Sequence, residues 1–256
     1  KLNCTFIAFS RVVNASLQVT SSVGVGASGM IGSTMLEVLS KATDWNVAGA
    51  VRSLATANGL APPLSGKLIA GYDLAAPDQL VQLFAQMRPD VVVNCAGLTK
   101  HLPAGNEPIS ALTMNALLPH RLAALCDTSG ARLIHVSTDC VFSGSKGFYS
   151  ETDHADATDV YGKTKHLGEV TGPGVVTLRT STIGHERGTR YGLLEWFLAQ
   201  TECKGYRRAV FSGLPTVEFA KVVRDLVIPD CDMAGLYNVG ARPIDKDSLL
   251  RLIAET

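Results

Sequence analysis

Short apolar runs alternate with longer amphipathic segments along most of this chain. Apolar segments occupy residues 17–25, 46–51, 133–136 and 175–179, and a continuous apolar run occupies residues 91–97. Such runs are typical of parallel strands that are buried on both faces. The segments between them repeat apolar residues at the spacing of an amphipathic helix. Five such alternations predict an α/β fold with an open, doubly wound parallel sheet, which binds ligands at the carboxyl ends of its strands.

The remaining elements follow from the same pattern. We expect short strands at 67–73 and 235–240, helices at 31–41, 77–87, 109–126, 191–200 and 217–227, and further helices that start near 161 and 245. The helix at 191–200 contains Trp196 and Phe197, which we expect to contribute to the core. The chain stops inside its last predicted helix, so we expect that a C-terminal piece is missing.

A glycine-rich turn stands between the first predicted strand and the first predicted helix. Its glycines are three residues apart, and glycine is needed there for a tight turn, for approach of the backbone to a pyrophosphate, and for helix–strand packing. The helix N-terminus adds free N–H groups and a positive dipole. The turn predicts a Rossmann-type dinucleotide site rather than a turn without a ligand. Its expected cofactor-binding residues are Gly26, Ser28, Gly29, Met30, Ile31 and Gly32.

These observations define an expected domain organisation. We expect residues 1–256 to form a single NAD(P)-binding domain, because no linker divides the chain. Its cofactor-binding core would span about 17–180, and a small, mostly substrate-binding C-terminal portion would span about 181–256. Residues 1–16 remain an extension of uncertain origin.

The end of the second predicted strand bears on the choice of cofactor. An acidic residue at this place binds the ribose 2′-hydroxyl of NAD(H), whereas an arginine accommodates the 2′-phosphate of NADP(H). Arg52 and Ser53 occupy the place, and neither is acidic. We therefore expect a preference for NADP(H), with NAD(H) as the alternative.

Composition and charge exclude several classes of partner. Lys+Arg and Asp+Glu both number 23, so no basic surplus indicates nucleic acid or an anionic membrane surface. No apolar run approaches the roughly 20 residues of a membrane-spanning helix. We expect a small-molecule ligand, no nucleic acid and no membrane, and we keep a homodimer as an option.

The cysteines and histidines show no metal-binding pattern. The six cysteines include no Cys-x-x-Cys pair, and no histidine stands at zinc spacing from them. We expect no metal, reduced thiols and a cytoplasmic protein. Residues 1–9 resemble a signal peptide only briefly, because Arg11 and Asn14 interrupt the apolar stretch. We interpret the glycosylation sequons at Asn3 and Asn14 as chance.

The candidate chemistry lies in residues 137–169. Tyr161 and Lys165 are four residues apart, so on a helix they share one face. A neighbouring ammonium lowers the pKa of a tyrosine from about 10, which suits general acid–base work on a carbonyl or an alcohol. The Thr138 hydroxyl could hydrogen-bond the same oxygen. Taken alone, the pair is better explained by a surface helix that carries an aromatic cap.

Several motifs together carry a resemblance to a known family. They are Ser-Thr-Asp-x-Val-Phe from Ser137, Tyr-Ser-Glu from Tyr149, and Tyr-Gly-Lys-Thr-Lys-x-x-Gly-Glu from Tyr161. In these motifs the chain resembles the extended short-chain dehydrogenase/reductases, and within them the dTDP-4-dehydrorhamnose reductases. The resemblance implies that Thr138, Tyr161 and Lys165 are catalytic, and that the tyrosine and the lysine also contact the cofactor.

The resemblance also implies roles for residues outside these motifs. Asp73 would contact the adenine, although it equally suits the turn before the helix at 77–87. Asn115 would support the active-site lysine through a water, as part of the catalytic set. The segment expected beneath the cofactor ribose consists of Asn94, Cys95, Ala96 and Gly97.

The expected substrate contacts are Thr138, Asp139, Thr182 and Arg208. Thr182 occupies the place of a tryptophan of the resembled family, which leaves the identity of the sugar open. Arg208 belongs to a basic cluster with Lys204 and Arg207 that suits a nucleotide diphosphate. A solvated surface cluster explains it equally well.

The resemblance implies an NADP(H)-dependent reductase of a nucleotide-activated 4-keto-6-deoxy sugar, as in making dTDP-L-rhamnose for polysaccharides. Two alternatives remain: a nucleotide-sugar epimerase or dehydratase of the same fold, and a non-catalytic NADP(H)-binding regulatory protein. Asp139 does not separate reductase from dehydratase, because the reductases carry aspartate there too. The retained Tyr161 and Lys165 favour an enzyme over the regulatory protein.

Overall fold

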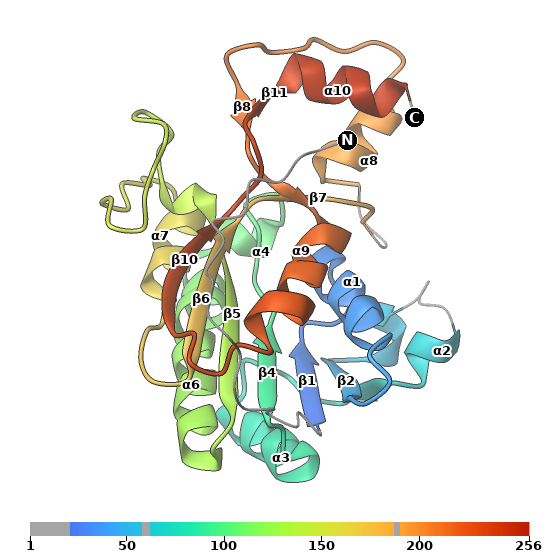
Figure 1. Ribbon diagram of the computed structural model, residues 1–256, viewed down its shortest axis with the longest axis vertical. Helices are drawn as coiled ribbons and strands as arrows, with labels where there is room; N and C mark the ends of the chain where they lie inside the picture. The colour runs from blue at the N-terminus through green and yellow to red at the C-terminus, as the bar shows by residue number, and fades with distance from the viewer. Residues whose placement is uncertain (1–20, 58–61, 187–189, 256) are drawn as a thin grey trace.

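A parallel seven-stranded sheet forms the centre of the computed structural model, which describes residues 21–57, 62–186 and 190–255. The strand order is β10-β6-β5-β4-β1-β2-β3, and every pairing in this sheet is parallel. The strands are β1 (Ser21–Val25), β2 (Asn46–Val51), β3 (Leu68–Ala70), β4 (Val91–Asn94), β5 (Arg132–Thr138), β6 (Val175–Thr180) and β10 (Gly235–Val239). The doubly wound α/β sheet expected from the sequence is confirmed (Figure 1).

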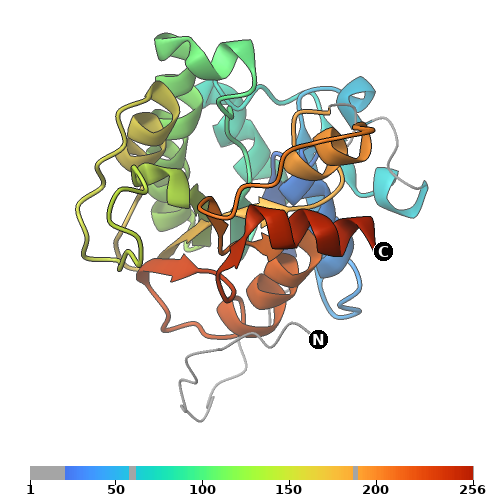
Figure 2. The same cartoon turned by 90° about the horizontal axis from the view of Figure 1, so that it is seen from above.

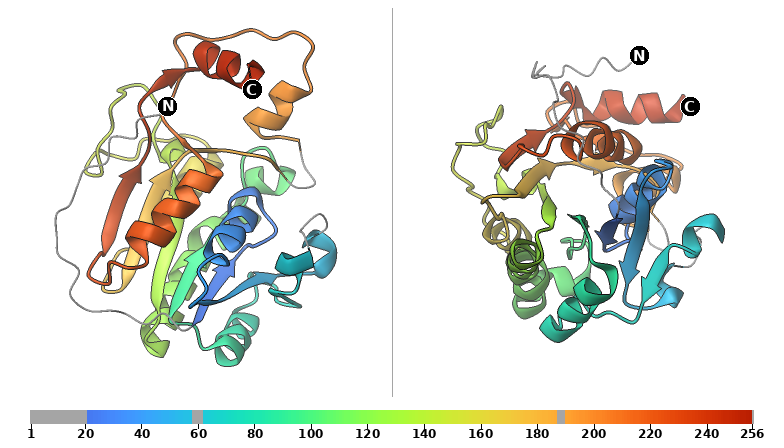
Figure 3. Two further views of the ribbon diagram at one scale, coloured as in Figure 1. Left: turned by 45° about the vertical axis from the view of Figure 1, so that its right-hand side comes forward. Right: turned by 60° about the horizontal axis from the view of Figure 1, so that its bottom comes forward.

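Helices cover both faces of this sheet (Figure 3). Alternate residues of one strand show the two layers, because Val91 and Val93 belong to one core cluster and Val92 to the other. The first cluster contains α1 (Met30–Leu39), α9 (Thr216–Val222) and the π-helical segment η4 (Val223–Val227). The second contains α3 (Pro77–Met87) and α6 (Leu118–Ser129). The helix α7 (Val160–Leu167) lies beside α6.

The long helix expected at 109–126 is present but is not uniform. It consists of α5 (Pro108–Ala111), the π-helical segment η2 (Leu112–Leu117) and α6. Pro119 has no N–H, so it cannot donate to the carbonyl of Asn115 four residues earlier, and Leu118 N–H instead donates to Thr113 O. Single π-turns inside helices are frequent at functional sites, and this one contains the predicted site residue Asn115.

A small C-terminal portion lies over the carboxyl ends of the strands (Figure 2). Its elements are β7 (Thr182–Ile183), α8 (Leu193–Leu198), β8 (Val210–Phe211), β9 (Leu214–Pro215), β11 (Ile244–Asp245) and α10 (Lys246–Ala254). The expectation that Trp196 and Phe197 are core residues was wrong, because α8 has no buried residue and Trp196 is 41% exposed. The prediction used only the apolar composition of α8, and composition does not show that this helix lies away from both core clusters.

The remaining short elements connect these layers. They are η1 (Leu54–Ala57), α2 (Pro62–Ser65), α4 (Pro103–Asn106) and the 3₁₀ turn η3 (Asp139–Val141). The expected extension at 1–16, the stretch that resembles a signal peptide and the two sequons lie outside the described residues. Within the described residues, no helix is long and apolar enough to cross a membrane.

Candidate active site

The glycine turn lies where the sheet reverses its strand order. β1 pairs with β2 on one side and with β4 on the other, and this switch point is where doubly wound sheets bind ligands. Gly26 has a φ of +79°, and a Cβ on it would lie 2.7 Å from Ala96. A Cβ on Gly32 would lie 2.1 Å from the carbonyl oxygen of Gly26. The protein's own packing therefore requires both glycines.

Gly29 differs from the other two glycines of the turn. It is exposed, and the nearest atom to a Cβ on it would be 3.7 Å away, which is ordinary contact distance. It is also the N-cap of α1, and no side chain caps the helix there. No side chain therefore occupies the N-terminus of α1, and Ser28, Met30 and Ile31 beside it are partly buried. This cradle fits a pyrophosphate at a helix N-terminus.

The residues expected to select the cofactor lie at the adjacent strand ends. Arg52 and Ser53 follow β2 directly and are exposed. Asp73 is also exposed, and its Oδ1 accepts the N–H of Ala75 at 3.0 Å. The turn-forming alternative for Asp73 is thus present in the structure. Whether Asp73 also contacts an adenine stays a prediction.

The segment after β4 contains both open and fully buried positions. Asn94 is buried, and its Oδ1 accepts the N–H of Ala96 at 3.1 Å while its Nδ2 lies 3.0 Å from Nδ1 of His135. The Asn94 side chain therefore stabilises the turn that follows β4. Cys95 is partly buried and Gly97 is exposed, so backbone and small side chains form the upper surface of this segment.

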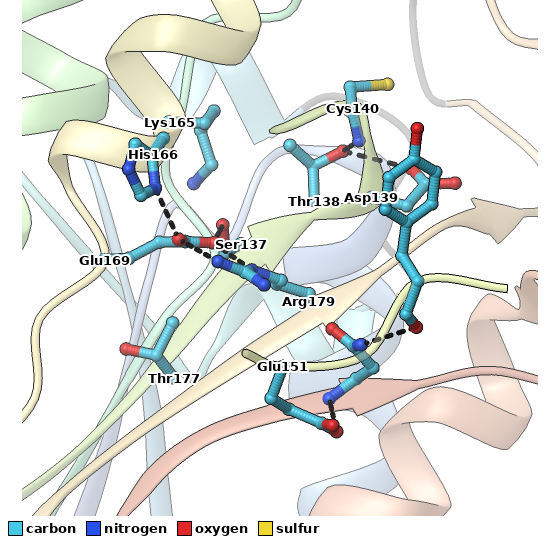
Figure 4. Close-up of polar contacts among 12 residues, drawn as sticks. Ser137, Thr138, Asp139, Cys140, Glu151, Lys165, His166, Glu169, Thr177 and Arg179 are labelled. Atoms are coloured by element: carbon cyan, nitrogen blue, oxygen red, sulfur yellow. Dashed lines mark hydrogen bonds and ion pairs between the residues drawn. The ribbon is translucent and has the colours of Figure 1, made fainter. Parts of the chain in front are cut away.

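Three of the predicted catalytic residues come from β5 and α7. Figure 4 shows two of them, Thr138 and Lys165. Thr138 is the last residue of β5, and its Oγ1 accepts the N–H of Cys140 at 3.1 Å. Tyr161 stands in the first turn of α7 and Lys165 in its last. The Lys165 side chain is buried, and its Nζ donates to the carbonyl of Val136 at 2.8 Å.

Two glycines of the predicted motif place α7 against these strands. A Cβ on Gly162 would lie 2.4 Å from the carbonyl oxygen of Cys140, and one on Gly168 would lie 1.9 Å from that of Asn115. The helix therefore contacts η3 at its start and η2 at its end. Asp159 caps the N-terminus by accepting the N–H of Gly162 at 2.8 Å.

The pKa of Tyr161 beside Lys165 shifts in the direction opposite to the one expected from the sequence. Burial raises the pKa of Tyr161 above its usual value, a hydrogen bond with Thr138 opposes this, and the charge of Asp139 adds to it. The expected lowering by Lys165 was wrong, because burial is the dominant effect. Burial also lowers the pKa of Lys165 to about 8, against the opposing charges of Glu169 and Cys95. At neutral pH the tyrosine is a protonated phenol and the lysine is charged.

Asn115 joins the loop after β4 to the catalytic helix. Its side chain is fully buried; Oδ1 accepts the N–H of Leu98 at 2.8 Å, and Nδ2 donates to the carbonyl of Leu98 at 2.9 Å. Nδ2 also donates to Oγ1 of Thr164 at 3.2 Å. Since Thr164 immediately precedes Lys165, Asn115 supports the lysine's turn of α7 through direct contacts.

Sequence reasoning missed a buried ion pair next to this helix. Arg179 Nε and Nη2 donate to the two carboxylate oxygens of Glu169, each at 2.7 Å, and both side chains are 4–5% exposed. His135 was also missed: it is fully buried, and burial lowers the pKa of its imidazole well below the usual value. A charged residue inside the apolar run 175–179 was the signal for Arg179.

The predicted substrate residues all lie at or beyond the carboxyl edge of the sheet. Asp139 is exposed, and its Oδ1 accepts the Thr138 hydroxyl at 3.3 Å. Thr182 is partly buried in β7, two residues beyond the end of β6, and Arg208 is exposed just before β8. Among the residues described, no group of three or more His, Cys, Asp and Glu side chains could hold a metal ion.

Comparison with known proteins identifies relatives of this chain. The family described as the RmlD substrate binding domain matches residues 22–200. The probable low-salt glycan biosynthesis reductase Agl14 of Haloferax volcanii is 28% identical over 228 residues, which cover 85% of this chain and 73% of the relative. A dTDP-4-dehydrorhamnose reductase of Salmonella typhimurium is 38% identical over 120 residues, which cover 46% of this chain and 40% of the relative. This chain thus aligns with less than half of that reductase's length.

Solved structures share the fold at low sequence identity. A dTDP-4-dehydrorhamnose reductase of Bacillus anthracis in complex with NADP superposes with a TM-score of 0.75 at 20% identity, over 94% of this chain and 82% of that one. An ADP-L-glycero-D-manno-heptose-6-epimerase of Helicobacter pylori gives 0.77 at 15% identity, over 96% and 84%. The fold alone therefore does not separate reductase from epimerase. The family match, which covers most of the chain, shows that this protein belongs to the RmlD substrate binding domain family, the dTDP-4-dehydrorhamnose reductase-like branch of the extended short-chain dehydrogenase/reductases.

Proposed function

We propose that this protein is an NADP(H)-dependent reductase that acts on the ketone of a nucleotide-activated 4-keto-6-deoxy sugar. The observation that carries the proposal is that Thr138 at the end of β5 and the glycine turn at the end of β1 lie at the same carboxyl edge of the parallel sheet, with only β4 between the two strands. The helix α7 supplies Tyr161 and Lys165 at this edge. The relatives named as reductases support the reaction type.

The ionisation of the site suits reduction rather than oxidation as the starting direction. A bound reduced nicotinamide supplies the hydride for the sugar ketone. Tyr161, protonated at neutral pH, donates its proton to the alkoxide oxygen that forms. Thr138 donates a hydrogen bond to the same oxygen. Lys165, charged below pH of about 8, holds the nicotinamide ribose and favours the phenolate that Tyr161 becomes.

The two alternatives are less well supported. An epimerase shares the fold at 15% sequence identity, whereas the relatives at 28% and 38% identity are named reductases. A regulatory binder would not need Lys165 to be buried, since burying an ammonium is costly without a use for it. The described cysteines are free thiols, which fits the reducing cytoplasm as the compartment we propose. A homodimer stays a prediction.

The proposal is tested by the initial rate of NADPH oxidation by purified protein. The substrate is dTDP-4-keto-6-deoxyglucose, isomerised in the same tube, and the control omits it. We expect oxidation that depends on the sugar and yields a 6-deoxyhexose. If the protein binds NADPH but does not oxidise it with this sugar, the proposed substrate is wrong.

Arg52 gives a separate prediction about the cofactor. Changing Arg52→Ala removes the cation expected to pair with the 2′-phosphate, so NADPH should bind about tenfold more weakly while NADH binding changes little. Fluorescence titration with each cofactor measures the ratio. Lys67→Ala is a matched control, because Lys67 lies just before β3 at the opposite end of the neighbouring strand. An unchanged NADPH/NADH ratio in Arg52→Ala would remove Arg52 from the selectivity determinants.

A further inference from the structure

The Glu169–Arg179 ion pair lies directly behind the catalytic helix. Gly168 ends α7, and because it has no Cβ the chain passes close to Asn115 and turns Glu169 toward the sheet. There Glu169 meets Arg179 of β6 through two hydrogen bonds of 2.7 Å. His166 Nδ1 lies 2.9 Å from the second carboxylate oxygen. Every carboxylate oxygen is thus engaged in a nearly buried place.

The Glu169 carboxylate also contacts β5, the strand whose Val136 carbonyl accepts the Lys165 ammonium. Ser137 Oγ donates to Glu169 Oε1 at 2.8 Å, and Lys165 Nζ donates to the carbonyl of Val136, the preceding residue, at 2.8 Å. Lys165 and Glu169 therefore bind two adjacent residues of β5, and these residues come immediately before Thr138 (Figure 4). A shift of Glu169 would shift the strand end and the lysine together.

The arginine extends this arrangement to the loop that follows Thr138. Its guanidinium carbon lies 4.8 Å from the centre of the Phe142 ring, and that ring stacks on Tyr149 at 4.2 Å with an interplanar angle of 10°. The main-chain carbonyl of Tyr149 in turn accepts a hydrogen bond from Nδ2 of Asn238 on β10 at 3.2 Å. The ion pair thus joins α7, β5, β6 and the loop around the site.

We infer that Glu169 is a positioning residue for the proposed reductase reaction: with Arg179 it fixes where Lys165 stands and keeps its ammonium charged beside the cofactor. This inference rests on the proposed function. The charged or titratable groups that act on Lys165 are Glu169 beyond α7, Cys95 after β4 and His135 on β5. Burial holds the cysteine as a thiol and the histidine as a neutral ring. Glu169 is therefore the one formal negative charge among these groups at neutral pH.

The test measures NADPH affinity by fluorescence from about pH 6 to about pH 9.5 in the full chain. In the wild type, affinity should weaken above pH about 8, as Lys165 loses its proton. Glu169→Gln removes the charge that favours the Lys165 ammonium. The fall of NADPH affinity with rising pH, here called the pH limb, should therefore move about one pH unit lower, and binding at pH 8 should weaken about fivefold. Glu169→Asp keeps the charge and should keep the wild-type limb.

The matched control is Arg132→Gln. Arg132 is a buried arginine at the opposite end of β5, where it donates to the carbonyls of Val227, Ile228 and Met233. It should lower the melting temperature without moving the pH limb. If Glu169→Gln does not fold, Glu169→Gln combined with Arg179→Gln removes both buried charges. Its affinity should still fall at a lower pH than in the wild type, but by a smaller shift, because loss of the Arg179 cation offsets part of the loss of the carboxylate.

The outcomes separate this inference from the proposed function. An unmoved limb in Glu169→Gln, or an equal shift in Arg132→Gln, overturns the positioning role even if turnover is normal. Wild-type binding of NADPH without turnover of the keto sugar overturns the proposed substrate and leaves the pH test decisive for Glu169.

Discussion

Tyr161→Phe is expected to abolish reduction of the keto sugar while leaving NADPH binding nearly intact. The phenol is the proton donor of the proposed reaction, and a positioned general acid contributes about 10²–10⁴-fold to the rate. That range corresponds to about 3–5 kcal/mol of transition-state stabilisation. The ring itself stays, so the packing of α7 changes little, and folding stability should change by no more than about 1 kcal/mol.

The measurement pairs the rate of NADPH oxidation with NADPH fluorescence titration. Tyr237→Phe is the matched control, because it removes the same atom from a tyrosine on β10, whose hydroxyl donates to the carbonyl of Ala234 at 3.1 Å. It should retain nearly full activity. If Tyr161→Phe kept more than about a tenth of the wild-type rate, another group would have to be the acid.

The raised pKa of Tyr161 gives this prediction a direction. A phenol with a depressed pKa would serve best as a base, in oxidation of the alcohol. Burial instead holds Tyr161 protonated at neutral pH, so the phenol is available as a proton donor. The site is therefore set to give a proton, as reduction of a ketone requires.

The sheet and the catalytic set were predictable from sequence for local reasons. Parallel strands buried on both faces must be apolar along their length, so runs such as 91–97 marked them. Tyr161 and Lys165 were recognisable because they and their neighbouring motifs lie within one short stretch. The glycines at 162 and 168 belonged to the same motif, and the structure supplies their reason in the contacts with η3 and η2.

What sequence could not supply depends on which elements meet. Glu169 and Arg179 stand on different elements, and only the fold makes them a buried pair. The sign of the Tyr161 pKa shift was wrong because it depends on burial, which residue spacing does not report. The exposure of α8 was missed for the same reason: the apolar residues of the helix expected at 191–200 predicted a core helix, yet α8 has no buried residue.

The glycine turn yields the second large effect, and it distinguishes folding from cofactor binding. Gly32→Ala would place a Cβ 2.1 Å from the carbonyl oxygen of Gly26. That atom belongs to the backbone of a turn already packed on Ala96, so it cannot move aside easily. We expect a loss of folding stability of about 3 kcal/mol, at the upper end of the usual cost of overpacking, measured by denaturant unfolding.

Gly29→Ala should give the opposite result. Gly29 has φ −77° and ψ 169°, which any residue adopts, and a Cβ there meets nothing closer than 3.7 Å. Stability should therefore change by no more than about 1 kcal/mol, the scale of an N-cap substitution. NADPH binding should nevertheless weaken at least about tenfold, or about 1.4 kcal/mol, because the methyl group enters the space that a pyrophosphate needs.

The two variants therefore make one experiment with opposite expected outcomes. Each adds a single methyl group to the same turn, so a general intolerance of the turn to alanine predicts loss of stability in both. A dinucleotide site predicts that Gly32→Ala loses folding stability and that Gly29→Ala loses only ligand binding. If Gly29→Ala bound NADPH as tightly as the wild type, the open space at the start of α1 would not be where the pyrophosphate lies, and the cofactor placement on which the proposed reaction depends would have to be given up.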